Sequence, residues 1–337
     1  MKKSKRIDWI DSLKGLGMFF VIWGHSFTKI NYSMRKYIYA FHIPLFFFTS
    51  GLVCEKDLKL NFISFIKKKV NSLIVPYFVI NIIGIIINRV LIYFNIINKI
   101  TFFEHIMGML YSHDEVYRIP VGSTWFILTL FLVQVMFYLI NKISRDDRDL
   151  FFLSLFSALV GYLNSISEYE IYGPWHIETV FTAILFYCLG YLFMKYKHYF
   201  SSLLESKIKS FVLGFALFII SLFFVMVNSR VSMHSNWYGS IVSFYISALS
   251  CIFGLVLFVN LFLKKSILFK KIGEYSMFYL AYHSFLIILY RHFFPIFMSG
   301  NLNFIILSII ISFVLIPFAI IVYKKFPLLV GNIKFLK

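Results

Sequence analysis

Residues 11–27 read DSLKGLGMFFVIWGHSF, an apolar run with Lys14 near its start and His25 near its end. Apolar runs of this length are typical of transmembrane α-helices, and we predict a span over residues 12–30. The eleven residues from Lys14 to His25 make almost three helical turns, so the two side chains share one face about 16 Å apart along the axis. Ionisable side chains inside a span are costly and indicate a functional site.

Comparable apolar runs recur along the whole chain. It has 337 residues, of which 60% are hydrophobic and 14% charged, with a mean hydropathy of +0.81, whereas soluble domains have about 25% charged residues. We predict an all-α polytopic integral membrane protein, because lipid offers no partner for open backbone groups. A basic interfacial helix is expected over residues 59–70. The single transmembrane domain, residues 1–337, is expected to hold about ten spans: 12–30, 37–54, 73–97, 123–142, 150–166, 177–195, 209–228, 238–263, 275–296 and 302–323.

The distribution of basic residues predicts the orientation. The two terminal segments and the loops after even-numbered spans hold 24 of the 33 Lys and Arg, and the opposite loops hold 7. This asymmetry places the N-terminus and the C-terminus in the cytoplasm. Because topology accounts for the basic charge, we expect a lipid bilayer and no nucleic acid as partner. The three cysteines are scattered and give neither a disulfide nor a metal pattern, so no metal is expected.

Several short motifs, taken in order, resemble the membrane-bound acyltransferase-3 family, which includes O-antigen and peptidoglycan O-acetyltransferases. The matching segments are Asp11, Lys14, Gly15 and His25, then FHIPLFFFTSG at 41–51, FIKKK at 65–69, Pro76-Tyr77, Trp125-Phe126 and YLAYH at 279–283. The chain departs from the commoner pattern at Lys14 and at 67–69, where the family usually has arginine. Lysine keeps the charge and loses the two-pronged guanidinium.

The resemblance implies acyl transfer from a cytoplasmic acyl-CoA, usually acetyl-CoA, to a hydroxyl of an extracytoplasmic surface polysaccharide. It makes His25 the catalytic candidate, acting either as general base on the hydroxyl or as the nucleophile that takes the acyl group. Acetyl-CoA would be a substrate, and no permanently bound cofactor is expected. Four lysines on the predicted cytoplasmic side are candidates for binding its phosphates, and three of them could instead anchor the chain to anionic lipid. The four are Lys14, Lys67, Lys68 and Lys69.

Six further residues are candidates for contacting the acceptor or supporting the histidine: Asp11, His42, Arg89, Trp125, Tyr282 and His283. Asp11 stands three residues before Lys14, a spacing that allows an ion pair. Arg89 could line the acceptor site or extend to the outer interface, and Trp125 could stack on a sugar ring or anchor the interface. His283 could act directly or structurally. His113 and His234 are assigned no role.

The leading interpretation is a membrane O-acetyltransferase of the bacterial cytoplasmic membrane that modifies a surface polysaccharide. The alternatives are transfer of another acyl group, such as succinyl, by the same machinery, and a polysaccharide flippase or polymerase without acyltransferase activity. A small-solute transporter is a further alternative, disfavoured because the sequence shows no internal repeat. Ionisable residues concentrate in few spans, which favours an enzyme over a flippase.

Overall fold

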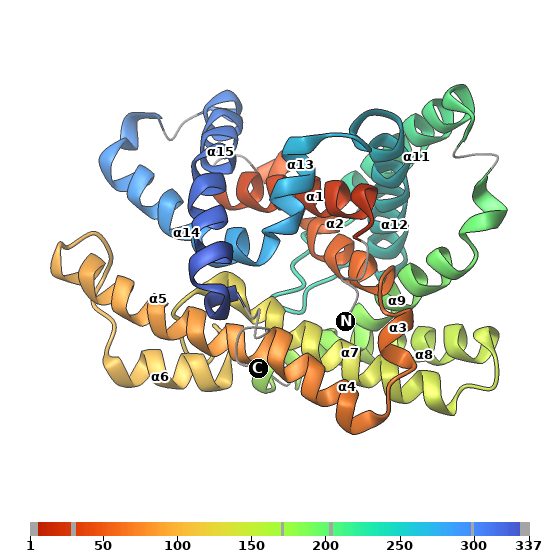
Figure 1. Ribbon diagram of the computed structural model, residues 1–337, viewed down its shortest axis with the longest axis horizontal. Helices are drawn as coiled ribbons and strands as arrows, with labels where there is room; N and C mark the ends of the chain where they lie inside the picture. Colours follow the sequence, from red (N-terminus) through yellow and green to blue (C-terminus); the bar gives the residue numbers. More distant parts are fainter. Residues whose placement is uncertain (1–5, 28–31, 170–171, 202–204, 298–299, 331–337) are drawn as a thin grey trace.

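The computed structural model describes residues 6–27, 32–169, 172–201, 205–297 and 300–330, and these residues fold into helices (Figure 1). No β-strand forms among them, and one isolated bridge joins Ser232 to Trp237. The prediction of an all-α fold is confirmed. The helices of 18 or more residues in these ranges are α1 (Asp8–Ser26), α2 (Tyr32–Gly51), α5 (Val75–Tyr93), α7 (Trp125–Ile143), α8 (Asp147–Ser165), α9 (Ile177–Lys195), α11 (Lys207–Val227), α12 (Ile241–Phe258), α14 (Ser276–Phe293) and α15 (Asn301–Lys325).

The chain has the helices of a polytopic membrane protein. Within the described residues, six helical segments are long and apolar enough to cross a bilayer. A seventh is added if α13 (Ile267–Glu274) and α14, which meet at 88°, count as one span. The helices α1, α2 and α8 are also of spanning length, but each carries ionisable residues. The count of ten spans therefore stays a prediction, although a long helix lies at each predicted position.

The basic segment near residue 60 is not a separate interfacial helix. α4 (Phe62–Lys69) runs through a π-helical turn, η1 (Val70–Ile74), directly into α5, and Figure 1 shows this run in orange. The 32 residues from Phe62 to Tyr93 form one candidate span. Pro76 lacks a backbone N–H and its ring crowds the preceding turn, so a wider turn just before it lets the helix continue.

Helix α1 crosses the middle of the molecule beside α13 and α2 (Figure 1). Two glycines allow the α1 and α13 backbones to touch: a Cβ on Gly15 would lie 1.9 Å from the Phe269 carbonyl oxygen, and one on Gly273 would lie 1.8 Å from that of Asp11. Close backbone contact of this kind is typical of small residues at helix–helix interfaces in membranes. This contact fixes the Asp11 end of α1 against α13, while its other end packs between α2, α14 and α15.

The remaining elements are short. They are α3 (Glu55–Leu58), α6 (Phe102–Tyr111) and the single turns η2 (Gly122–Thr124), η3 (Pro174–His176), η4 (Lys197–Phe200), η5 (Val259–Leu263), η6 (Pro295–Phe297) and η7 (Pro327–Val330). Of these, η2 contributes Ser123 to the wall of the cavity beside the end of α1, and η3 places His176 against Trp125, which lines the same cavity.

Candidate active site

His25 lies in the last turn of α1 and meets a second histidine from the other end of the chain. Its Nδ1 is 3.0 Å from Nε2 of His283, which is fully buried in the middle of α14. The two ring centroids are 5.0 Å apart. His25 itself is half-buried and lines two cavities. Sequence analysis selected both histidines and gave no indication that they form a pair.

A backbone carbonyl sets the protonation of this pair. Nδ1 of His283 lies 2.7 Å from the Tyr279 carbonyl oxygen, which can only accept, so Nδ1 carries the hydrogen. In the neutral ring Nε2 is then an acceptor, and it takes a hydrogen bond from Nδ1–H of His25. Nε2 of His25 is left with its lone pair free. The arrangement therefore presents the form of imidazole that can act as base or nucleophile.

His42, the next candidate, stands on α2 close to the same site. Its ring centroid is 6.5 Å from that of His25, and its Nδ1 donates to the Ile38 carbonyl oxygen over 2.8 Å. Tyr39 packs beside both rings, with its own ring 4.9 Å from His42 and 6.2 Å from His25. The backbone contact leaves the Nε2 lone pair of His42 available as a hydrogen-bond acceptor.

A cavity of about 360 Å³ brings His25, His42 and Trp125 together. Trp125 begins α7, is 5% exposed and packs edge-on against the His234 ring at 5.3 Å. A second cavity, of about 480 Å³, shares His25 and adds Arg291 to its wall. Of the six supporting candidates, the structure thus places His42, Trp125 and His283 beside or in contact with His25.

Asp11 and Lys14 line a different cavity, of about 390 Å³, at the other end of α1. Arg6 and Lys56 also line it, so three cations face this space together with the carboxylates of Asp11, Glu55 and Glu274. Arg6 pairs with Glu274 at 3.6 Å. Asp11 Oδ2 is buried without a hydrogen-bond partner, so the ion pair with Lys14 that their spacing allowed does not form through this oxygen. Lys14 and His25 thus face separate cavities at the two ends of one helix.

The lysine cluster of α4 does not line the Lys14 cavity. Lys68 and Lys69 both donate to the Asp57 carboxylate, and Lys67 is exposed. Burial alone would raise the pKa of Asp57, but Lys69 and Lys68 hold that pKa below its usual value. Two of the three lysines are therefore engaged in an ion-pair network that joins α3 to α4.

Arg89 and Tyr282 also lie away from both cavities beside His25. Arg89 donates to the Ile100 carbonyl oxygen over 3.2 Å and lies over the Phe102 ring, so it ties the end of α5 to α6. Tyr282 packs against Phe278, with ring centroids 4.7 Å apart.

A buried cluster that sequence analysis missed supports the cavity wall. Glu178 accepts a hydrogen bond from His113 Nε2 over 3.0 Å, and His176 Nδ1 lies 3.4 Å from the same oxygen. One potential metal-ligand atom from each of these three side chains lies within 4.8 Å of the others, close enough to hold a metal ion. However, the two imidazoles stack 4.0 Å apart at 19°, so their in-plane lone pairs do not converge on one point. The geometry fits a hydrogen-bonded support better than zinc ligation.

This cluster reaches the cavity beside His25 through aromatic contacts. The His176 ring lies 4.8 Å from Trp125 and 4.9 Å from His234. His234 in turn lies 3.1 Å from Asp114, and both line the cavity. Trp175 and His176 both have a positive φ, a costly conformation that the surrounding contacts must hold. No short motif links these residues, because they come from three separate loops.

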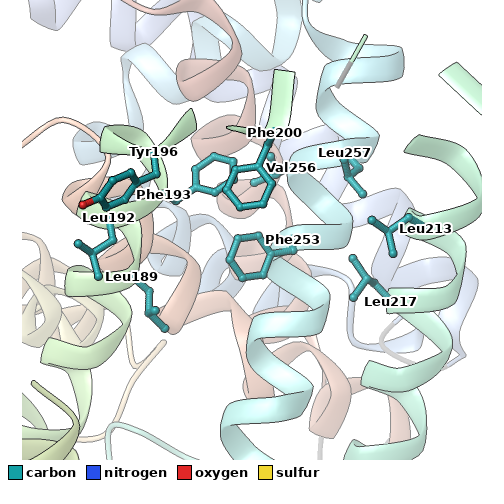
Figure 2. A pocket seen from close by; sticks show the side chains of 10 residues that line it. All are labelled: Leu189, Leu192, Phe193, Tyr196, Phe200, Leu213, Leu217, Phe253, Val256 and Leu257. Atoms are coloured by element: carbon teal, nitrogen blue, oxygen red, sulfur yellow. The ribbon is translucent and has the colours of Figure 1, made fainter. Parts of the chain in front are cut away.

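Figure 2 shows a third kind of cavity, about 490 Å³, between α9, α11 and α12. Its wall is apolar, with Phe193, Phe200 and Phe253 facing its centre and Leu213 and Leu217 across from them. Tyr196 is the one titratable side chain in this wall, and its hydroxyl is bonded to Asp147. This cavity offers dispersion contacts and no group that could activate a hydroxyl.

Comparison with known families gives a match over most of the chain. The family model described as an acyltransferase domain matches residues 7–324, which includes both histidines of the pair and both ends of α1. No curated protein matches the sequence.

Proposed function

Because this chain belongs to the acyltransferase-3 family, we propose that it transfers an acetyl group from acetyl-CoA to a hydroxyl of an extracytoplasmic surface polysaccharide. The protein would then lie in the bacterial cytoplasmic membrane. The observation that carries the proposal is the histidine pair. His25 lines a cavity, and its hydrogen bond to His283 fixes the tautomer that leaves Nε2 free.

In the direct route, His25 Nε2 takes the proton of the acceptor hydroxyl as its oxygen attacks the thioester carbonyl. The new C–O bond forms, the C–S bond breaks, and the imidazolium returns the proton to the departing thiolate. The products are the acyl ester and coenzyme A. In the alternative route Nε2 attacks the thioester carbonyl first, the C–S bond breaks and the thiolate leaves, which gives an acyl-imidazolium. The acceptor oxygen then attacks the acyl carbon, the C–N bond breaks to restore the neutral imidazole, and the hydroxyl proton passes to the thiolate, so the products are again the ester and coenzyme A. Both routes need the lone pair that the histidine pair leaves free.

The cavity at the other end of α1 is the proposed entrance of the donor. Coenzyme A carries several phosphates, and Lys14, Lys56 and Arg6 face this cavity. A pantetheine arm lying along α1 would carry the thioester from there toward His25, a separation of about 16 Å along the helix. Lys67 is exposed and could add charge, whereas Lys68 and Lys69 would have to leave Asp57 to do so.

The test uses the purified full chain with radiolabelled acetyl-CoA and the surface glycan of the cell that makes it. We expect label on the glycan with the wild type and none with His25→Ala. His198→Ala is the matched control, since His198 is exposed on η4, outside the cavities described above. Adding an excess of unlabelled succinyl-CoA to the same reaction tests whether the donor is acetyl-CoA, because a succinyl-transferring enzyme would use it in place of the label. Wild-type transfer by His25→Ala would remove the proposed base, and glycan translocation without transfer would favour the flippase.

A further inference from the structure

Resting on the proposed function, we propose that the acceptor is anionic, and that Arg35, Arg230 and Arg291 bind a carboxylate or phosphate carried by the glycan. Arg35 and Arg230 line the cavity that holds His25, His42 and Trp125, and Arg35 and Arg291 line the adjoining one. His25 belongs to both walls, so a hydroxyl placed at Nε2 has these guanidinium groups around the rest of its sugar.

The choice of arginine is itself informative. At the span ends, loops and termini predicted to face the cytoplasm, 3 of 24 basic residues are arginine, whereas 4 of 7 are arginine at the span ends and loops on the opposite side. Lysine serves as well as arginine for orienting spans, so topology does not explain the difference. Three of those four outer arginines converge on the two cavities. Arginine, with its planar fork, is the residue suited to paired contacts with carboxylate or phosphate.

These arginines lack carboxylate partners in the part of the chain that the structure describes, where no ion pair involves them. Among the described residues, Asp114 is the one carboxylate lining either cavity, and it is engaged by His234 and by the Ile119 backbone N–H. The cavities therefore carry an excess of positive charge that a neutral sugar would leave unbalanced.

The guanidinium groups are held in place by neutral partners. Arg35 lies 4.8 Å over the Tyr39 ring and donates to its hydroxyl. Arg291 Nη2 donates to the carbonyl oxygens of residues 25, 26 and 27 at 2.9–3.3 Å, while its Nε is buried without a partner. Arg230 lies 5.2 Å over the Trp237 ring. Positioned cations without counter-charges, beside a free base, form a receptor for an anion.

The experiment measures binding separately from catalysis. His25→Ala protein in phosphatidylcholine nanodiscs is titrated with a polyglucuronate oligomer and with its carboxyl-reduced, neutral counterpart. Titration with glucose 1-phosphate and with glucose makes the same comparison for a phosphate. We expect at least one charged probe to bind about tenfold or more tightly than its neutral match, since charge-assisted hydrogen bonds are stronger than neutral ones.

Substitutions assign the effect to the cavity. Arg35→Gln and Arg230→Gln should each weaken the charged probe about tenfold and leave the neutral one unchanged, and Arg35→Lys should recover part of the loss. Arg118→Gln is the matched control, because Arg118 is an exposed outer arginine outside both cavities. Equal binding of charged and neutral probes would overturn the inference. The inference would also be overturned if charged and neutral probes bound equally in phosphatidylglycerol nanodiscs, because the arginines would then bind lipid headgroups. Charge-selective binding without acetyl transfer would refute the proposed function alone.

Discussion

At the scale of single residues, the proton on His25 is placed by a relay that starts at a backbone carbonyl. Tyr279 C=O fixes the hydrogen on His283 Nδ1, and the acceptor nitrogen of that ring fixes the hydrogen on His25 Nδ1. The reactive lone pair is thus set by α14, a helix more than 250 residues away in sequence. Helix geometry keeps the carbonyl of residue 279 and the side chain of residue 283 on one face.

Removing His283 should therefore slow chemistry more than binding. In His283→Ala, His25 loses its acceptor and its ring is free to choose either tautomer, so kcat should fall about 100-fold with little change in the KM for acetyl-CoA. His283→Gln, whose amide oxygen can accept from His25, should recover part of kcat. Steady-state kinetics on both variants check this. A wild-type kcat in His283→Ala would mean that the pair is structural.

Asp57 gives a prediction about acid stability. Its folded-state pKa is below its usual value despite burial, because Lys69 and Lys68 bind the carboxylate. A depressed pKa stabilises the fold above the unfolded value, about 3.9, and this contribution is lost as pH falls through the folded pKa. Asp57→Asn should therefore lower the unfolding free energy at pH 7, by roughly 1–3 kcal/mol, through lost charged hydrogen bonds. Near pH 3 the difference from wild type should shrink.

Thermal unfolding in detergent at both pH values measures this effect. Glu55→Gln is the comparison, because the Glu55–Lys59 pair is largely exposed and should contribute little to stability. An Asp57→Asn protein as stable as wild type at pH 7 would show that the network is dispensable.

At the scale of elements, the contact between α1 and α13 depends on two glycines. A methyl group on Gly15 would overlap the Phe269 carbonyl, which is backbone and cannot rotate away. Gly15→Ala should therefore push the helices apart and destabilise the protein by about 1–3 kcal/mol. Gly214→Ala on α11 is the control, since its nearest neighbour would be 3.6 Å away. Thermal unfolding of both variants tests this, and equal midpoints would contradict it.

The sequence was most informative about elements and least about their junctions. Apolar runs located every long helix, because the cost of burying backbone in lipid leaves few alternatives. They did not show that α4 continues into α5, since the π turn depends on the local crowding at Pro76 rather than on hydrophobicity. Likewise the 88° bend between α13 and α14 follows from packing of α13 on α1.

At the scale of the whole molecule, α1 separates two chemically different cavities. Its Lys14 end faces a cavity lined by three cations and three carboxylates, and its His25 end faces cavities lined by arginine, tryptophan and histidine. The family resemblance in the sequence selected Lys14 and His25, at the two ends of α1. It missed Arg35, Arg230, Arg291 and the Glu178 cluster, because only the tertiary structure brings those loops together. The excess of arginine in the outer loops was the one signal available from sequence, and it shows up only when arginine and lysine are counted separately.

This arrangement works for transfer across a membrane only if the Lys14 cavity faces the cytoplasm, and labelling of single cysteines tests that orientation. The native Cys54, Cys188 and Cys251 are buried, so they should stay silent. Lys99 and Arg145 are exposed in loops predicted to lie on opposite sides. An impermeant maleimide on intact cells should label Lys99→Cys, and should reach Arg145→Cys only after permeabilisation. The reverse pattern would put the arginine-lined cavity in the cytoplasm, where an extracytoplasmic acceptor could not reach His25.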